Sequence, residues 1–156
     1  MKRKLYLFLF GFGLLTALFM IPQQMQAALG ENTDSIESDR KMLSAGHRNP
    51  TVLGNYTVHE ISSDSTTIRE YVSRAGMVFG VAWNGLTHPD LTPLLGSYDG
   101  EYRETLLQTP RVHGRRYLRV KAQHVIVEKW GHMRNLRGRA YVPSLIPAGV
   151  NIDDIK

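Results

Sequence analysis

Residues 1–27 have the hydrophobic pattern of an export signal. Three cations near the N-terminus precede an uncharged apolar run over residues 5–21. This run is shorter than the ~20 residues that a membrane-spanning helix needs. The polar residues that follow lead to Ala27 and Ala28, so we expect cleavage after one of these small residues, with an uncleaved anchor as the alternative. Residues 28–156 are then predicted to form a single exported domain.

Two later segments have apolar positions at helical spacing. In residues 34–45, Ile36 and Leu43 recur on one side of the predicted helix. Residues 89–102 have Leu and Tyr side chains at steps of three and four. Gly96 lies inside this second stretch and favours its division into two short pieces.

Between these helical segments the hydrophobic period falls to two, which is typical of β-strands. Residues 56–62, 66–73 and 77–83 are rich in β-branched and aromatic side chains, and turn sequences separate them. They predict a three-stranded antiparallel meander. The third segment is apolar on both faces, so we expect a central strand that a helix covers on one side. Gly80 would leave room there for Tyr71 or another ring.

The register of the first hairpin can be predicted from the complementarity of facing residues. A two-residue turn at Asp64-Ser65 gives four complementary cross-strand pairs: Ile61 with Ile68, Glu60 with Arg69, His59 with Glu70, and Val58 with Tyr71. A shift by one residue would lose this matching, so this register is favoured.

A second β region follows in the last third of the chain. It comprises strands over residues 116–121, 124–129 and 132–142, with Trp130-Gly131 as the turn between the last two. The tail over residues 148–156 is expected to cap the sheet or to add an edge strand. These patterns predict an α+β domain. Its antiparallel sheet has about five or six strands, from an N-terminal meander and a C-terminal hairpin, with one or two helices packed on one face.

The absence of cysteine limits the chemistry available to the chain. It excludes disulfides, Cys-ligated zinc, iron–sulfur clusters and thiol catalysis. The six histidines lack the spacing that places two imidazoles on one element, so we expect no metal and no cofactor. The one acid–base candidate is His59 with Glu60, or with Glu70 across the hairpin, and a structural ion pair explains these residues more simply.

Charge is distributed unevenly along the mature chain. Residues 28–110 carry six basic and eleven acidic side chains, whereas residues 111–139 carry nine basic side chains and one acidic residue, Glu128. The basic segment can present a face to an anionic partner, neutralise the acidic part of the chain, or keep an exposed sheet face soluble.

If the basic segment is a binding face, its candidate residues are Arg116, Arg119, Trp130, Arg134 and Arg137. The mixture of cations and rings would suit nucleic acid, but an export signal argues against that partner. An envelope protein, or an anionic lipid, lipopolysaccharide or polysaccharide, is the expected partner instead.

Short strings along nearly the whole mature chain form a fairly specific combination. They are A-L-G-E at 28–31, Y-T-V-H-E at 56–60, R-E-Y-V-S at 69–73, G-M-V-F at 76–79 with V-A-W at 81–83, P-D-L at 89–91, G-R-A-Y-V-P at 138–143 and P-A-G-V at 147–150. In this combination the chain resembles an uncharacterised family of exported bacterial proteins, domain of unknown function 2844. The resemblance implies a bacterial, Gram-negative periplasmic protein, and it brings no established activity, cofactor or catalytic residue.

We therefore expect a small binding or assembly factor that is exported, either periplasmic or secreted, and not an enzyme. The alternative is a hydrolase-type enzyme that acts on an envelope substrate through His59 with Glu60 or Glu70. A deep pocket at His59 and Glu70 would favour the enzyme, whereas a flat basic or aromatic face would favour binding.

The signal pattern makes a direct prediction about processing. Protein recovered from a periplasmic fraction should give an N-terminal sequence that starts at Ala28 or Leu29, because the small residues before these positions suit signal peptidase. Edman sequencing or intact-mass measurement checks this. Full-length chain that starts at Met1 and stays in the membrane pellet would contradict it.

Overall fold

The computed structural model describes residues 29–32, 46–47, 50–110, 112, 114 and 116–156. The predicted signal over residues 1–27 and the predicted helix over residues 34–45 lie outside the described residues.

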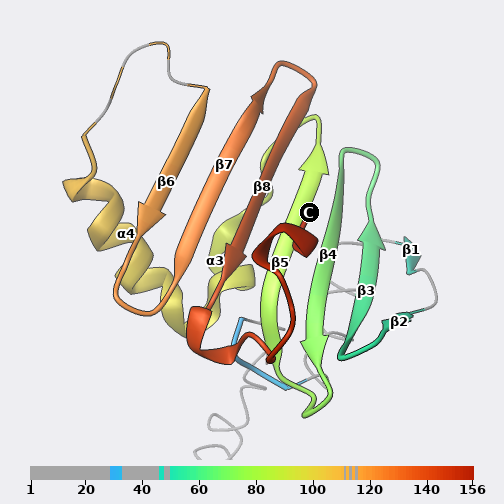
Figure 1. The fold of residues 1–156 in the computed structure, drawn as a ribbon. Helices are drawn as coiled ribbons and strands as arrows, with labels where there is room; N and C mark the ends of the chain where they lie inside the picture. The colour runs from blue at the N-terminus through green and yellow to red at the C-terminus, as the bar shows by residue number, and fades with distance from the viewer. Residues whose placement is uncertain (1–28, 33–45, 48–49, 111, 113, 115) are drawn as a thin grey trace, which may run out of the picture.

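One antiparallel sheet organises the described chain (Figure 1). Its strands are β1 (Gly46–His47), β2 (Thr51–Leu53), β3 (Tyr56–Ser62), β4 (Thr66–Ser73), β5 (Val78–Gly85), β6 (Tyr117–Lys121), β7 (Ile126–His132) and β8 (Asn135–Tyr141). The order across the sheet is β1-β3-β4-β5-β8-β7-β6, and β2 pairs with the same strand as β1. The sheet is therefore seven strands wide rather than five or six. The additional edge strand is formed by β1 and β2. Their sequence is rich in residues that interrupt strands and lacks a hydrophobic period of two, so it did not predict a strand.

The register of the first hairpin is confirmed. Strands β3 and β4 pair Ile61 with Ile68, Glu60 with Arg69, His59 with Glu70, and Val58 with Tyr71. The turn is held by Ser63 and Thr66: the Ser63 amide and hydroxyl both donate to the Thr66 carbonyl oxygen, at 2.9 Å each. The two-residue turn thus fixes which side chains of β3 and β4 share a face.

The helices cover one face of the sheet, which we call the inner face (Figure 1). They are α3 (Leu91–Leu95), a 3₁₀ turn η2 (Gly96–Tyr98) and α4 (Asp99–Gln108). Asp90 caps α3 by accepting a hydrogen bond from the Thr92 amide at 3.0 Å. Gly96 has a positive φ of 51° at the break between the pieces, which confirms the predicted division.

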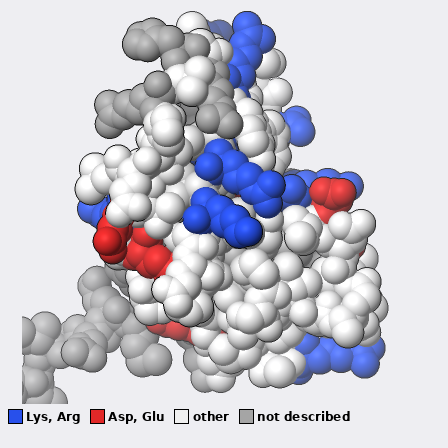
Figure 2. Space-filling view, turned by 60° about the vertical axis from the view of Figure 1, so that its left-hand side comes forward, with Lys and Arg blue, Asp and Glu red and all other residues white. Residues whose placement is uncertain are grey.

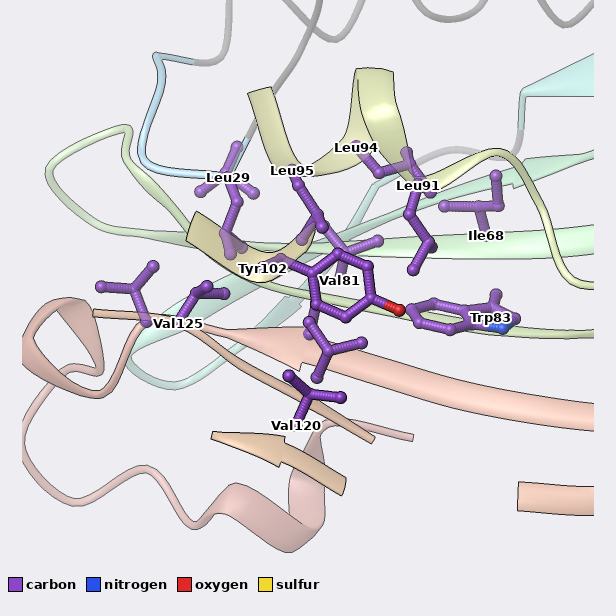
Figure 3. Close-up of a cluster of buried hydrophobic side chains, with 14 of the residues drawn as sticks. Leu29, Ile68, Val81, Trp83, Leu91, Leu94, Leu95, Tyr102, Val120 and Val125 are labelled. Atoms are coloured by element: carbon purple, nitrogen blue, oxygen red, sulfur yellow. The ribbon is translucent and has the colours of Figure 1, made fainter. Parts of the chain in front are cut away.

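The inner-face core lies between these helices and the central strands (Figure 3). Leu94, Leu95 and Tyr102 from the helices face Val81 and Trp83 of β5 in the same buried cluster. Strand β5 is the middle strand of the sheet and is buried along Val78–Trp83, which confirms the predicted central strand under a helix.

The residue that follows the predicted signal completes this core. Leu29 is fully buried in the cluster, and its amide donates to the Leu94 carbonyl oxygen at 3.0 Å. The next amide, of Gly30, donates to Val78 of β5 at 2.8 Å. The start of the expected mature chain is thus part of the folded domain.

The C-terminal tail covers the opposite face of the sheet, which we call the outer face (Figure 1). After the 3₁₀ turns η3 (Pro143–Leu145) and η4 (Ile152–Asp154), Ile155 is fully buried against Gly80 of β5. A Cβ atom on Gly80 would come within 2.9 Å of the Ile155 Cδ1 atom. The space beside Gly80 is therefore occupied by an aliphatic side chain rather than a ring, and the tail lies across the sheet rather than forming an edge strand.

The turn between β7 and β8 differs from the prediction. Trp130 and Gly131 belong to β7, and the two-residue loop is Met133-Arg134. Arg134 has a positive φ of 65°, a conformation that Gly or Asn adopts more easily. Gly131 is needed for another reason: a Cβ there would collide with the Asn135 carbonyl oxygen of the facing strand.

The buried tail predicts that Ile155 stabilises the fold far more than its neighbour Ile152. Truncating Ile155 to Ala should lower the free energy of unfolding by ~2–5 kcal/mol, because it empties a packed site over Gly80. Ile152 is 37% exposed, so Ile152→Ala is the matched control and should change the free energy by no more than ~0.5 kcal/mol. Urea denaturation of both variants measures this, and equal losses would contradict the packing role of Ile155.

Candidate binding site

The sheet register gathers six side chains on the outer face of β6, β7 and β8. One cross-strand row is Tyr117, Trp130 and Arg137, and the next row is Arg119, Glu128 and Arg139. We call these six residues the β6–β8 array. The residues that alternate with them along the strands, such as Val120, Val127 and Ala140, belong to the inner-face core.

Glu128 lies at the centre of the array and is only 4% exposed. Its Oε1 accepts a hydrogen bond from the Tyr117 hydroxyl at 2.7 Å and lies 3.2 Å from Arg119 Nε. Its Oε2 accepts from Arg139 Nε at 2.6 Å. Two hydrogen-bond donors and one further cation, from the two neighbouring strands, therefore satisfy one buried carboxylate.

These contacts decide the protonation states within the array. Burial alone would raise the pKa of Glu128, but the hydrogen bonds from Tyr117 and Arg139 and the charges of Arg139 and Arg119 hold the pKa below its ordinary value. Burial and the bond to this carboxylate raise the pKa of Tyr117, so its hydroxyl remains a donor at neutral pH. At neutral pH the cluster of Glu128, Arg119 and Arg139 therefore has one net positive charge.

Arg139 joins the array to the C-terminal tail. Its guanidinium lies between the rings of Trp130 and Tyr141, 5.8 Å from each ring centroid. Its Nη1 donates to the carbonyl oxygen of Ile152 at 2.7 Å, and Asp153 Oδ1 lies 3.6 Å from the same nitrogen. Arg139 is therefore held on several sides and has little freedom to bind another molecule.

A wide, shallow depression of about 430 Å³ lies over this part of the outer face. Residues of the array form one side of it, and three tail residues form the other: Asp153, Ile155 and Lys156. An open depression with aromatic rings and a guanidinium in fixed position is more typical of a binding surface than of an active site, which usually encloses its substrate.

Arg137 of the array and two arginines beside the array carry charge without an acidic partner among the described residues. Arg137 is exposed and donates through Nε to the neutral Asn135 side chain at 3.1 Å. Arg116 is exposed directly before β6, and Arg134 is exposed in the β7–β8 turn. Because β6 begins where β7 ends, all three lie at the same end of the sheet. Figure 2 looks from the β6 side and shows Lys and Arg side chains at the top, where this end of the sheet lies, and further ones in the middle of the view.

All five residues predicted for binding thus come from one end of β6–β8, but they differ in their freedom. Arg116, Arg134 and Arg137 are available, whereas Arg119 is already in an ion pair with Glu128. The prediction missed Tyr117, Glu128 and Arg139 as members of the same group. The sequence signal for them is that Glu128 is the single acid in the basic segment, inside an apolar strand.

Few of the described ion pairs join the basic segment, residues 111–139, to the acidic part of the chain, residues 28–110. Arg119 and Arg139 pair with Glu128, which belongs to the basic segment itself. The described pair that joins the two parts is His124 with Glu101 of α4, at 3.0 Å.

The three candidate catalytic residues do not share one face. His59 and Glu70 face each other across the β3–β4 ladder on the inner side, where Glu70 is 1% exposed. Glu60 is on the outer side, and its Oε2 accepts from Arg69 Nε at 2.9 Å. Strand alternation therefore separates Glu60 from the other two residues.

The described ranges hold neither a cluster of metal ligands nor a membrane-spanning helix. They contain no group of three or more His, Asp or Glu side chains placed to hold a metal ion. They also contain no helix that is long and apolar enough to cross a membrane.

Comparison with known proteins places the chain in a family. The model of the family described as "Protein of unknown function (DUF2844)" matches residues 25–155, which is most of the sequence. The chain belongs to this family. The match confirms the resemblance drawn from the strings of the mature chain, and the DUF2844 description assigns no activity.

Other comparisons add little to the DUF2844 assignment. No curated protein matches the chain. A cysteine-rich secretory protein from Staphylococcus aureus has a similar structure, with a TM-score of 0.47 and 9% sequence identity. The similarity covers 75% of this chain and 44% of that protein, so the chain spans less than half of its length.

The array makes stability depend on pH through Glu128. Glu128→Gln should lower the free energy of unfolding at pH 7 by about 3 kcal/mol, because it leaves the partly buried Arg139, and the more exposed Arg119, without their counter-charge. The folded pKa lies below the ordinary value of 4.5, so the carboxylate stabilises the fold fully above that value and loses its contribution as the pH falls through the folded pKa.

Denaturant titrations between pH 7 and pH 3 measure this difference. The gap between wild type and Glu128→Gln should narrow on acidification. Glu104→Gln, on the exposed side of α4, is the control and should change the free energy by at most ~0.5 kcal/mol. A gap that stays constant down to pH 3 would contradict the role assigned to the charge of Glu128.

Proposed function

We propose that this DUF2844 protein is an exported, periplasmic binding factor without enzymatic activity, and that it binds an anionic component of the cell envelope. The observation that carries the proposal is the group of three exposed arginines, Arg116, Arg134 and Arg137, at one end of the array. The export part of the proposal rests on the signal pattern of residues 1–27.

The chemistry of these side chains supports an anionic ligand. Guanidinium groups bind phosphate and carboxylate groups with paired hydrogen bonds. Trp130 and Tyr117 lie beside them and offer ring surface to the apolar part of a sugar or lipid headgroup. Arg137, Trp130 and Tyr117 are held in strands, whereas Arg134 is in a turn and Arg116 directly precedes β6. Little ordering of the backbone is therefore needed on binding.

The hydrolase alternative has weaker support. It needs His59 to act with Glu60 or Glu70, but Glu60 is on the other side of the sheet and Glu70 is almost fully buried. The depression over the outer face is lined by neither His59 nor Glu70. We therefore retain binding as the proposed function.

The proposal predicts that binding weakens with salt and depends on the arginines at the end of the array, not on the total charge of the protein. Wild-type protein should bind vesicles of phosphatidylglycerol and phosphatidylcholine at low ionic strength, and binding should weaken steeply towards 0.15 M salt, where the screening length is ~8 Å. The double variant Arg134→Gln, Arg137→Gln should lose at least about tenfold in affinity, since each cation near an anionic surface contributes ~1 kcal/mol.

A second double variant provides the matched control. Arg74→Gln with Arg103→Gln removes the same charge from the β4–β5 turn and from α4, away from the array, and should keep most of the affinity. Melting temperatures should change little for either variant, because exposed charges contribute only ~0–1 kcal/mol. Soluble anionic polysaccharide as competitor separates glycan from lipid recognition. Equal binding by both double variants, or salt-insensitive binding, would refute the proposed site.

A further inference from the structure

A second cavity, of about 390 Å³, opens on the inner side of the sheet, away from the array. It lies between the β3–β4 turn, the loop from β5 to α3, and α3 itself. Ile68 and Leu94, both 3% exposed, form its apolar floor, and Pro89 and Pro93 add to the wall. Polar residues of the two loops also line it, and an apolar floor with convergent polar groups is typical of sites for small molecules.

Hydrogen bonds between the two loops hold the walls of this cavity in place. The Leu86 amide donates to the Ser65 carbonyl oxygen at 2.8 Å, and the Thr66 hydroxyl donates to the Thr87 carbonyl oxygen at 3.1 Å. Gly85 permits this close approach, because a Cβ there would collide with Ser65 and lie 2.7 Å from the Thr66 Cα. The cavity is therefore already formed in the free protein.

His88 supplies a polar group with a defined tautomer in the wall. Its Nδ1 accepts a hydrogen bond from the indole Nε1–H of Trp83 at 2.9 Å, so the proton of the neutral ring is on Nε2. Burial, and then the nearby charge of Lys129, lower the pKa of His88, which favours the neutral form. The imidazole thus offers Nε2–H as a donor to a ligand.

Asp90 sets the charge at the rim. Its Oδ1 accepts from the Thr92 amide at 3.0 Å, and this bond, with a second one to the Thr92 side chain, lowers the pKa of Asp90. The carboxylate is therefore ionised at neutral pH. Asp90 is the charged residue in the lining, whereas Arg103, whose charge also lowers the pKa of Asp90, is paired with Asp99. A carboxylate in the lining disfavours an anionic ligand, and a donor at His88 favours a ligand with a neutral oxygen acceptor.

We infer that this cavity is a binding site for a small, neutral, mostly apolar molecule whose carbonyl oxygen accepts a hydrogen bond from His88 Nε2–H. The apolar part of the ligand lies over Ile68 and Leu94. This site is separate from the proposed anion-binding face, since it lies on the inner side of the sheet.

The two tryptophans of the chain allow a test within a single spectrum. Titration of the full mature chain with 1-acetyladamantane, a rigid apolar ketone, should move the indole N–H signal of Trp83 in a ¹H–¹⁵N spectrum. The backbone amides of Ser65 and Thr87 should move with the same saturation curve. The indole signal of Trp130, on the outer face, should stay in place and serves as the internal control.

Variants and a second ligand separate this site from non-specific binding. Ser65→Phe adds a ring at the exposed rim and should reduce the affinity by at least about tenfold. Ser144→Phe places the same ring at another exposed serine and should leave the affinity unchanged. Adamantane-1-carboxylate has the same cage and should bind several-fold more weakly than the ketone because of Asp90.

Three outcomes would overturn the inference. One is a Trp83 signal that does not move on addition of the ketone. Another is equal affinity of the Ser65→Phe and Ser144→Phe proteins, which would place binding elsewhere. The third is tighter binding of the carboxylate than of the ketone, which would refute the ligand class. Unchanged Trp130 shifts and melting temperature show that Ser65→Phe still folds, so a loss of binding by that protein supports the site.

Discussion

Each strand of this sheet sends alternate side chains to opposite faces, and both faces of the central strands are covered. Helices α3 and α4 cover the inner face, and the C-terminal tail covers part of the outer face. Every residue of β5 from Val78 to Trp83 is therefore buried, although only half of them contact the helices. One turn, at Ser63–Thr66, fixes the register of the first hairpin, and a shift there would exchange the residues of the two faces.

The outer face combines a charged cross-strand row with an apolar one. The charged row runs across six strands and consists of Arg119, Glu128, Arg139, Ala82, Arg69 and Glu60. Ala82 is the small residue between two arginines, and both of these donate to main-chain oxygens of the tail: Arg139 to Ile152 at 2.7 Å and Arg69 to Lys156 at 3.0 Å. The neighbouring row, with Gly80 between Tyr141 and Tyr71, receives Ile155. The tail therefore satisfies the arginines and the apolar row at the same time.

The sequence predicted those parts of the fold that depend on local patterns. Facing pairs of opposite charge or similar shape identified the register of β3 and β4, and the two-sided apolar run identified β5 as central. The turn between β7 and β8 was placed at Trp130-Gly131 because glycine is typical of turns, whereas this glycine is required by close approach of Asn135. The tail position and the Glu128 cluster depend on contacts between residues far apart in sequence, for which a single sequence carries little signal. The candidate arginines for binding were chosen by composition, but which of them are free and which are paired follows only from the position of Glu128.

Strand β5 binds both ends of the described domain, since Gly30 donates to Val78 and Ile155 packs on Gly80. During synthesis the chain appears from its N-terminus, so Tyr71 and Phe79 are made well before the Ile155 side chain that shields them. The loop closed by this last contact spans about half of the sequence, and such non-local contacts slow folding. The outer face can therefore be completed only after Ile155 has been synthesised, and until then an aromatic surface and an open sheet are accessible to chaperones and to aggregation.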